Sequence, residues 1–363
     1  MKAGEDRSYR IASIPGDGIG VEVTAVARKV LDATATLGGF SLEWTTLDWS
    51  CARYLETGSM MPDDGIQTLS GFDSIFLGAV GHPSVPDHVS LWGLLIPIRR
   101  AFQQYVNLRP ARLFAGVTSP LRDRGPEDID MVIVRENSEG EYSQIGGRHN
   151  VGTPAEFAVQ ESVFTRQGIE RIVRFAFDLA RTRGRSVVAA TKSNGIVHTM
   201  PFWDEVAQSV ADEYADVRYE RAHIDALAAR MVLAPHSIDV VVGSNLFGDI
   251  LSDLAAAICG GLGFAPSGNV NPSSEFPSMF ESVHGSAPDI AGRGIANPVA
   301  QVLSGAMMLR HLGEGASADR IDRAVETLFS DAKVRTPDRG GADGTDAVGD
   351  ELVRLVGLAD SAA

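Results

Sequence analysis

The feature that most constrains the fold of this chain is a repeated alternation of short apolar runs with longer amphipathic stretches. The apolar runs predict strands at residues 11–15, 73–80, 131–135, 186–192 and 238–244. The amphipathic stretches predict helices at residues 21–37, 166–182, 200–214, 246–259, 297–313 and 316–332. Strands that alternate with helices indicate an α/β protein whose largely parallel sheet is covered by helices.

Residues 141–164 depart from this alternation. The segment is rich in Gly and polar residues, and its apolar residues Phe157, Val159 and Val163 recur at every second or fourth position. A period of two predicts extended structure. We expect an antiparallel hairpin here, suited to serve as an arm in a dimer.

The charge of the chain restricts its partners. Its 363 residues include 32 Lys and Arg and 47 Asp and Glu, which gives a formal net charge of −15 at pH 7. A negative field argues against nucleic acid or an anionic membrane as the main partner. An anionic substrate would therefore need a local cluster of arginines.

The cysteines and the apolar runs bear on the compartment. Cys51 and Cys259 form neither a CxxC pair nor a disulfide framework, which fits a reducing environment. The first residues lack the apolar core of a signal peptide, and no apolar run approaches the length of a membrane span. We expect a cytoplasmic protein.

A glycine-rich loop, IPGDGIG at residues 14–20, follows the first predicted strand and opens a predicted helix. Backbone N–H groups at such a helix start can bind an anion. The spacing is G-x-G-x-G, however, and differs from the G-x-G-x-x-G of a Rossmann fingerprint. A phosphate-binding loop and a tight strand-to-helix turn both remain open.

Two aspartates follow the apolar run that ends near residue 244. Asp249 and Asp253 are four residues apart in a predicted helix, so both carboxylates lie on one face and can approach one hard cation such as Mg²⁺ or Mn²⁺. A third acid, Asp225, also follows a strand-like run. The alternative is a solvated face whose acids favour the positive helix start.

Arginines cluster between residues 99 and 135. Arg99, Arg100, Arg109 and Arg112 occur close together, and Arg135 ends a predicted strand. Guanidinium groups bind carboxylates in bidentate fashion, which suits a polyanionic substrate of an acidic protein. Apolar neighbours make Arg109 and Arg135 the better candidates for a pocket, with surface charge as the alternative.

Three residues are candidates for acid–base chemistry. Tyr142 lies in RENSEGEYS, Lys192 ends a predicted strand, and His284 lies in HGSAPD. Nearby cations can lower the pKa of a lysine so that it acts as a base, and a tyrosine can then donate a proton. A solvated lysine, an interface tyrosine and a loop histidine that contacts a ligand or backbone are the plainer alternatives.

With these motifs assembled, the sequence resembles the isocitrate/isopropylmalate dehydrogenase family over nearly its whole length. The matching blocks, in order, are IPGDGIG, NLRP, VRENSEGEYS, TKSN, SNLFGDILSD, HGSAPDIAGRGIANP and TPDRGG. Within the family, MMPDD, FLGAVGHP, PDHVSLWG and ENSEGEYS are most similar to dehydrogenases that act on tartrate or decarboxylate D-malate.

The resemblance implies a role for each candidate. Arg99, Arg109 and Arg135 match arginines that bind the substrate carboxylates. Tyr142 and Lys192 match the catalytic acid and base. Metal-binding carboxylates are matched by Asp225, Asp249 and Asp253.

The resemblance also implies partners and a coenzyme. Lys192 and Asp225 are expected to come from the neighbouring subunit, which makes the enzyme a homodimer with shared active sites. The coenzyme is expected to be NAD, the metal Mg²⁺ or Mn²⁺, and K⁺ a further activator with no identified local site. The residues that match the nucleotide site are Glu281, His284, Gly285, Ser286, Ala287, Asp289 and Asn297.

The fold implied is two-lobed and unlike a Rossmann domain, with mixed sheets covered by helices and a dimer arm. Residues 1–104 and 260–363 should form a large lobe with the nucleotide site. Residues 105–259 should form a small lobe with the metal carboxylates, the catalytic pair and the dimer interface.

The reaction implied is oxidation of a 2-hydroxy dicarboxylic acid, tartrate or D-malate, with decarboxylation of D-malate to pyruvate and CO₂. If SLWGLLIPIRR forms a continuous helix, Trp92 and Leu95 share the face of Arg99, and Trp92 leaves room only for C4 acids. Pro97 would kink or end that helix. The alternatives are a 3-isopropylmalate dehydrogenase, a metal-dependent hydrolase and a non-catalytic dicarboxylate-binding protein.

Overall fold

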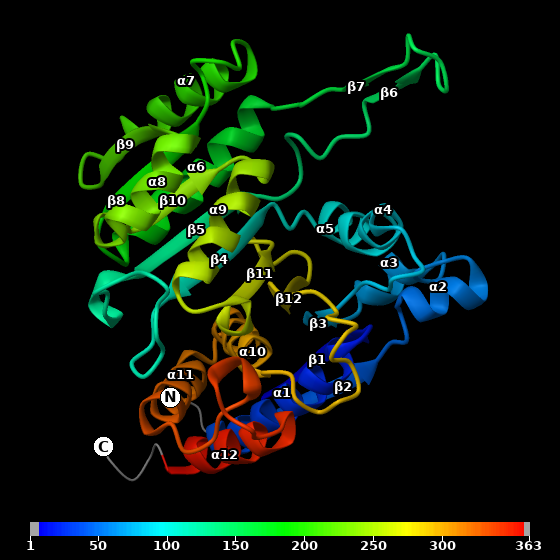
Figure 1. Cartoon of the computed structure of the whole chain (residues 1–363), viewed down its shortest axis with the longest axis vertical. Coiled ribbons are helices and arrows are strands. Elements are labelled where there is room, and N and C mark those ends of the chain that lie inside the picture. The colour runs from blue at the N-terminus through cyan, green and yellow to red at the C-terminus, as the bar shows by residue number, and fades with distance from the viewer. Residues whose placement is uncertain (1–6, 359–363) are drawn as a thin grey trace. The chain divides into compact units, whose positions relative to one another are not determined.

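The computed structural model describes residues 7–358, which form two compact units (Figure 1). Unit 2 comprises Tyr105–Ala111 and Glu127–Ala255, and the other described residues belong to unit 1. The predicted small lobe ran through 105–259, whereas residues 112–126 and 256–259 lie in unit 1. Residues 112–126 belong to unit 1 because they pack against it. The Phe114 ring, for example, lies edge-on against the Phe329 ring, with ring centroids 5.1 Å apart.

The strands of unit 1 lie in the order β2-β1-β3-β12-β11. Their bounds are β1 Arg7–Gly16, β2 Phe40–Thr46, β3 Ser74–Ala79, β11 Pro266–Val270 and β12 Ser278–Ser282. Pairing is parallel from β2 through β12, and β11 is antiparallel to β12. Every residue of β3 is buried, which is why a central strand appears in the sequence as a continuous apolar run.

The helices of unit 1 cover these strands. They are α1 Ile19–Gly38, α2 Cys51–Thr57, α3 Gly65–Leu69, α4 Asp87–Ser90, α5 Ile96–Ala101, α10 Val299–His311, α11 Gly315–Asp331 and α12 Thr345–Leu358. Helix α1 buries Val23, Ala27, Val30 and Leu31 on one face and ends at Gly39, whose φ of 70° is the left-handed conformation that glycine accepts readily.

Unit 2 repeats the same architecture, with strands in the order β4-β5-β10-β8-β9. The strands are β4 Val106–Arg112, β5 Asp130–Glu136, β8 Ser186–Thr191, β9 Arg218–His223 and β10 Val240–Gly243, and pairing is parallel from β5 to β9. The helices are α6 Arg166–Arg181, α7 Thr199–Ala211, α8 Ile224–Leu233 and α9 Asn245–Ile258. The predicted α/β class, with a mixed sheet covered by helices, is confirmed.

The glycine-rich segment of unit 2 forms the expected antiparallel hairpin. Strand β6, Gly146–His149, pairs with β7, Phe157–Gln160, and every residue of both strands is exposed. In Figure 1 the hairpin projects away from the other strands of unit 2. Its role as a dimer arm stays a prediction.

The segment around Pro97 is helical but not one continuous α-helix. Helix α4 is followed by a π-helical turn, Leu91–Leu95, and then by α5, in which Pro97 occupies the first turn. Proline is tolerated there because its missing N–H has no partner in an α-helix anyway. The π turn takes up about one extra residue, so residues before and after it no longer share the face that an α-helix predicts.

Among residues 7–358, no helix combines the length and the apolar composition that crossing a membrane requires.

Candidate functional site

The carboxyl end of β10 leads directly into α9, which carries Asp249 and Asp253 one helical turn apart. The side chain of Asp249 is 32% exposed and that of Asp253 is 59% exposed. Burial and then the neighbouring Asp249 raise the pKa of Asp253, while Arg109 opposes the shift. Two oxygen ligands at this spacing fit a hard cation.

Arg109 joins both aspartates. Its Nη1 donates to Ser252 Oγ at 2.7 Å and lies 3.1 Å from Asp249 Oδ1 and 3.4 Å from Asp253 Oδ1. The Arg109 Nε is buried and has no hydrogen-bond partner within residues 7–358. The hydrogen bonds to Ser252 and the two aspartates therefore come from the outer nitrogen of the guanidinium.

Arg135 approaches the same carboxylate from the end of β5. Its Nη1 pairs with Asp249 Oδ1, and its Nη2 and Nε donate to Asn245 Oδ1 at 2.6 and 3.1 Å. The Arg135 side chain is only 3% exposed. Asn245, which the sequence reasoning missed, thus fixes the guanidinium plane, and Ser252 does the same for Arg109.

Tyr142 completes the cluster. Its hydroxyl donates to Asp249 Oδ2 at 3.0 Å, and its ring lies 5.6 Å from the Arg135 guanidinium carbon. Burial, followed by the negative charge of Asp249, raises the pKa of Tyr142. The hydroxyl therefore keeps its proton at neutral pH and can act as a donor.

Lys192 and Asp225 form a second group in unit 2. Lys192 follows β8, Asp225 lies in the first turn of α8, and Lys192 Nζ donates to Asp225 Oδ1 at 2.7 Å. This hydrogen bond lowers the pKa of Asp225. Among residues 7–358 no three His, Cys, Asp or Glu side chains gather as a metal site, so Asp225 does not join Asp249 and Asp253 within one chain.

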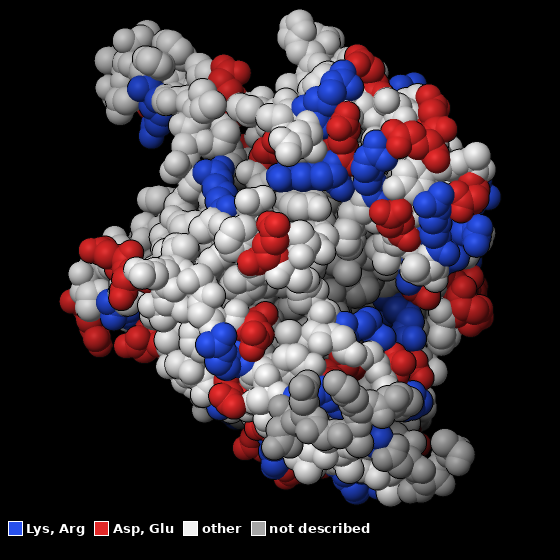
Figure 2. Space-filling model, turned by 180° about the vertical axis from the view of Figure 1, so that it is seen from behind, with Lys and Arg blue, Asp and Glu red and all other residues white. Residues whose placement is uncertain are grey.

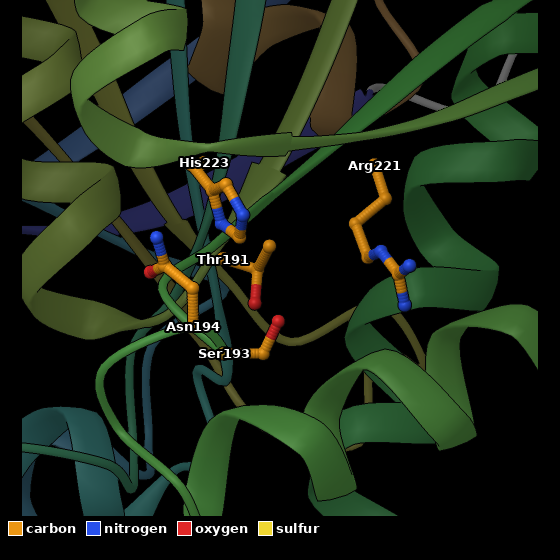
Figure 3. A pocket seen from close by; sticks show the side chains of 5 residues that line it. All are labelled: Thr191, Ser193, Asn194, Arg221 and His223. Carbon is orange, nitrogen blue, oxygen red and sulfur yellow. The ribbon is translucent and has the colours of Figure 1, made fainter.

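A polar cavity of about 310 Å³ adjoins the backbone on either side of Lys192. It is lined by Thr191, Ser193, Asn194, Arg221 and His223. In Figure 3, Thr191 and Ser193 lie between His223 and Asn194 on one side and Arg221 on the other. Thr191 Oγ1 and His223 Nδ1 are buried and have no hydrogen-bond partner in the described part of the chain. The other polar side chains of the lining, Ser193, Asn194 and Arg221, offer hydrogen-bonding groups to a ligand next to Lys192.

The positive charge that an anionic substrate would need is confined to one small region of unit 2. Figure 2 shows Lys and Arg interspersed with Asp and Glu on the face that it draws, with no broad basic region there. Arg109 and Arg135, both nearly buried, supply two guanidinium groups at one point of unit 2. This local pair is what an acidic chain needs to bind a polyanion.

The remaining predicted substrate arginine, Arg99, lies in unit 1 beside a residue predicted for the nucleotide site. Its Nη2 donates to Glu281 Oε1 at 2.8 Å, and Asn269 Nδ2 donates to the same oxygen at 2.7 Å. Arg99 Nε is buried and lacks a hydrogen-bond partner within residues 7–358. Glu281 thus orients the Arg99 guanidinium.

The continuous α-helix that would place Trp92 and Arg99 on one face is not formed. Because of the π turn, the Trp92 ring lies under the guanidinium of Arg100, 5.1 Å from its carbon, while Arg99 is buried against Glu281. Gly93 packs against Met60, because a Cβ added to Gly93 would lie 2.9 Å from the Met60 side chain. The argument that Trp92 fills a substrate pocket next to Arg99 therefore fails.

The glycine loop packs against the predicted nucleotide loop in unit 1. Ile19 N donates to Ser286 O at 2.9 Å, and a Cβ on Gly18, where φ is +56°, would lie 2.1 Å from that oxygen. Asp17 accepts from the N–H groups of Cys51 and Gly81 at 3.0 and 3.1 Å. These contacts favour the strand-to-helix turn over a phosphate-binding loop.

The predicted nucleotide loop carries several accessible groups. Gly285 and Asp289 are exposed, and an added Cβ at Gly285 would meet no atom within 4 Å. His284 Nδ1 lies 3.0 Å from Gly285 O, and its Nε2 is buried without a hydrogen-bond partner in the described residues. Burial lowers the pKa of His284, which keeps the ring neutral near pH 7.

The other residues of the nucleotide prediction also lie in unit 1. Ala287, next to Ser286, adopts a φ of 40°, which is uncommon for a residue with a side chain. Asn297 Nδ2 donates to Asp338 Oδ2 at 3.0 Å and its Oδ1 accepts from Val299 N at 3.1 Å. Asn297 is therefore held in place at the start of α10.

Similarity to known proteins identifies the family. Residues 10–352 match the family described as isocitrate/isopropylmalate dehydrogenase. A probable tartrate dehydrogenase/decarboxylase of Bacillus subtilis (strain 168) is 53% identical, with 95% of this chain and 97% of that protein covered. The decarboxylating D-malate dehydrogenase of Escherichia coli (strain K12) is 52% identical, with coverages of 96% and 99%.

The fold agrees with a solved structure from the same family. The crystal structure of isocitrate dehydrogenase from Methylococcus capsulatus superposes with a TM-score of 0.86 at 37% sequence identity, covering 96% of this chain and 99% of that one. The matches extend over almost the entire chain. The chain therefore belongs to the isocitrate/isopropylmalate dehydrogenase family and is a dehydrogenase.

Proposed function

We propose that this enzyme oxidises a four-carbon 2-hydroxy dicarboxylic acid, D-malate or a tartrate isomer, with NAD, and that it decarboxylates D-malate to pyruvate and CO₂. The observation that carries this proposal is the convergence of Arg109, Arg135 and Tyr142 on the carboxylate of Asp249. The names of the two relatives that are 53% and 52% identical support the substrate class.

Arginines bind the substrate. Arg109 and Arg135 are nearly buried, so a carboxylate beside them forms strong charge-assisted hydrogen bonds. Arg99 matches a third substrate-binding arginine of the family, and Glu281 orients its guanidinium within unit 1. A dicarboxylate thus meets more than one fixed cation, which selects against monocarboxylic acids.

Two side chains move protons. Lys192 takes the proton of the substrate's 2-hydroxyl, and Asp225, its hydrogen-bond partner at 2.7 Å, orients the amine. Tyr142 donates its phenolic proton to carbon 3 after CO₂ has left. The raised pKa of Tyr142 keeps that proton in place until then.

A divalent Mg²⁺ or Mn²⁺ would be held by Asp249 and Asp253, joined by Asp225 of a second copy, and would polarise the oxygen at carbon 2 when bound. The carboxylates of α9 and the neighbouring Arg109 guanidinium fit such a charged, chelating substrate. K⁺ is a candidate activator whose site is not assigned.

NAD would bind along the loop from His284 to Asp289. Glu281 and Asn297, which flank this loop in the sequence, would belong to the same site. The exposed Asp289 accepts a hydrogen bond from a ribose 2′-hydroxyl and repels a 2′-phosphate. Arg293, four residues on and also exposed, is the one nearby cation that reduces this preference. We expect kcat/KM to be higher with NAD than with NADP.

The active enzyme would be a homodimer in which each copy supplies Lys192 and Asp225 to the other. Apolar side chains that α8 and α9 leave exposed support an interface on these helices. They are Val232, Leu233, Leu246 and Ile250, of which Leu233 is 72% exposed. The exposed hairpin β6–β7 would serve as an arm of the same dimer.

The test is NADH formation, followed at 340 nm with Mn²⁺ and K⁺, across D-malate, L- and meso-tartrate, 3-isopropylmalate and isocitrate. D-malate or a tartrate isomer should give a kcat/KM at least roughly tenfold above the others, since one mis-sized apolar group is worth about 1–3 kcal/mol. A best rate with 3-isopropylmalate would assign the enzyme to that substrate.

A further inference from the structure

Glu141 lies directly before Tyr142 and binds the first turn of α9. Its Oε1 accepts a hydrogen bond from Ser244 Oγ at 2.7 Å, and its Oε2 accepts one from Leu246 N at 3.1 Å. These contacts join residues more than 100 positions apart in the chain. The residue next to the proposed proton donor is thus attached to the helix that carries Asp249.

The attachment completes the cap of α9. The first N–H groups of an α-helix have no partner within the helix. Ser244 Oγ accepts from Phe247 N at 3.4 Å, and Glu141 accepts from Leu246 N, so two of these donors are satisfied. A carboxylate at this position also interacts favourably with the positive end of the helix dipole.

The start of α9 also holds two residues that contact Tyr142, namely Arg135 and Asp249. Asn245, in the first turn, accepts from Arg135, and Asp249, one turn further, accepts from Tyr142. A change in the contact between Glu141 and α9 would therefore change the distance between the Tyr142 hydroxyl and its carboxylate.

The backbone on the other side of Glu141 is held as well. Gly140 N donates to Val163 O at 2.8 Å, and Val163 N donates to Gly140 O at 3.1 Å. Gly140 has a φ of +95°, and an added Cβ there would lie 3.2 Å from the ring of Phe164. Backbone hydrogen bonds thus hold the chain on one side of Glu141, and the Glu141 side chain holds it against α9 on the other.

We infer that Glu141 is a positioning residue that sets the orientation of Tyr142 for proton donation to the decarboxylated substrate. The inference rests on the proposed function, because it assigns to Glu141 a share in the step that Tyr142 performs. A misplacement of about 1 Å in a reacting group can reduce a rate about 100-fold. Loss of the anchor should therefore affect the tyrosine's step more than binding.

Three variants of the full-length enzyme separate the possibilities. Glu141→Ala removes both acceptors. Glu141→Gln can keep both hydrogen bonds, one of them reversed. Its amide oxygen can accept from Leu246 N, and its amide nitrogen can donate to the Ser244 hydroxyl. Glu161→Ala is the matched control, since Glu161 is an exposed acid of the same segment.

Two partial reactions isolate the step. One is NADH formation from D-malate, and the other is conversion of added oxaloacetate to pyruvate. Glu141→Ala should slow the oxaloacetate reaction at least tenfold in kcat, with a smaller effect on NADH formation and less than about a threefold change in KM. Glu141→Gln should restore most of the rate. In a Tyr142→Phe background, Glu141→Ala should add no further loss in the oxaloacetate reaction.

Equal losses in both partial reactions, or additive effects of Glu141→Ala and Tyr142→Phe, would overturn the inference and leave Glu141 as a helix cap alone. If the wild-type enzyme catalyses neither reaction, the proposed function has failed. Hydrogen exchange then still tests the anchor. Glu141→Ala must speed amide exchange at residues 140–143 and 246–247, and Glu161→Ala must not. Unchanged exchange in Glu141→Ala would reject the inference by itself.

Discussion

The hydroxyl of Tyr142 donates a 3.0 Å hydrogen bond to Oδ2 of Asp249, whose Oδ1 pairs with Arg109 and Arg135. One carboxylate thus joins the proposed proton donor, the two proposed substrate arginines and the proposed metal helix. A cation bound to Asp249 Oδ2 would compete with the hydrogen bond from Tyr142. In the proposed reaction, this side chain therefore couples proton donation by Tyr142 to metal binding.

The acid and the base should separate kinetically. Lys192→Met should abolish NADH formation, because no group remains to accept the hydroxyl proton. Tyr142→Phe should retain more of the oxidation and slow pyruvate formation from oxaloacetate about 100-fold or more, the usual contribution of a general acid. Stopped-flow measurement of NADH and enzymatic assay of pyruvate give both rates. Equal, small losses in the two variants would count against these roles.

The two aspartates of α9 should differ in their effect on stability. Asp249→Asn and Asp253→Asn should each weaken Mn²⁺ binding, because each removes an anionic oxygen ligand. Asp249→Asn should also lower the free energy of unfolding by about 2 kcal/mol, since the nearly buried Arg109 and Arg135 lose a shared carboxylate. Asp253 is more than half exposed, so its variant should change stability by less than about 0.5 kcal/mol.

Titration with Mn²⁺ by electron paramagnetic resonance and unfolding in urea measure these two effects independently. If both variants gave wild-type Mn²⁺ titration curves, or if the enzyme kept full turnover in EDTA, the proposed metal site would be rejected.

Shared active sites predict complementation between inactive variants. Heterodimers of Lys192→Met and Asp249→Asn copies, purified through two different tags, contain one intact site out of two if Lys192 crosses the interface. They should recover about half of the wild-type activity. Heterodimers no more active than either parent would show that each copy uses its own Lys192.

The periodicity of the sequence predicted most of the central elements. Helices α1, α6 and α9 lie within two residues of their predicted bounds, because their buried faces recur with the helical period. Strand β2 was not predicted, since most of its residues are partly or fully exposed and it lacks a continuous apolar run. The π turn at Leu91–Leu95 was missed because no local pattern distinguishes it from an α-helical turn.

The residue types of the candidate site were predictable, but their hydrogen-bond partners were not. Acid pairs and arginines in apolar surroundings indicate function by their chemistry alone. The contacts of Asn245 with Arg135 and of Ser252 with Arg109 join residues 110 and 143 positions apart. Such pairs follow from the order of strands in the sheet and leave no spacing signal in the sequence.

Glu136 should make stability depend on pH. It is fully buried, and burial raises its pKa from 4.5 to about 7, although N–H groups of Ser138 and Glu139 oppose the shift. Arg171 lies 3.6 Å from the carboxylate but donates to Ser138 Oγ, so burial dominates. Between about pH 4.5 and about pH 7, Glu136 therefore keeps its proton in the folded state and loses it in the unfolded state.

Because the folded pKa is raised, the contribution of the neutral carboxyl is fully present below about pH 4.5 and is lost as the pH rises to about 7. Relative to Glu136→Gln, which cannot ionise, the wild-type protein should lose up to about 3 kcal/mol of unfolding free energy over this window. Urea unfolding of both proteins at several pH values measures the difference. A difference that is independent of pH would show that Glu136 does not titrate there.

The most direct test of the account is the stoichiometry of the reaction with D-malate labelled with ¹³C at carbon 4. With NAD and Mn²⁺, equal amounts of NADH, ¹³CO₂ and unlabelled pyruvate should form, because oxidation at carbon 2 places carbon 4 β to the new ketone. They should form at a kcat/KM at least roughly tenfold above that for 3-isopropylmalate. Absence of NADH with D-malate and every tartrate isomer, or faster turnover of 3-isopropylmalate, would contradict the account.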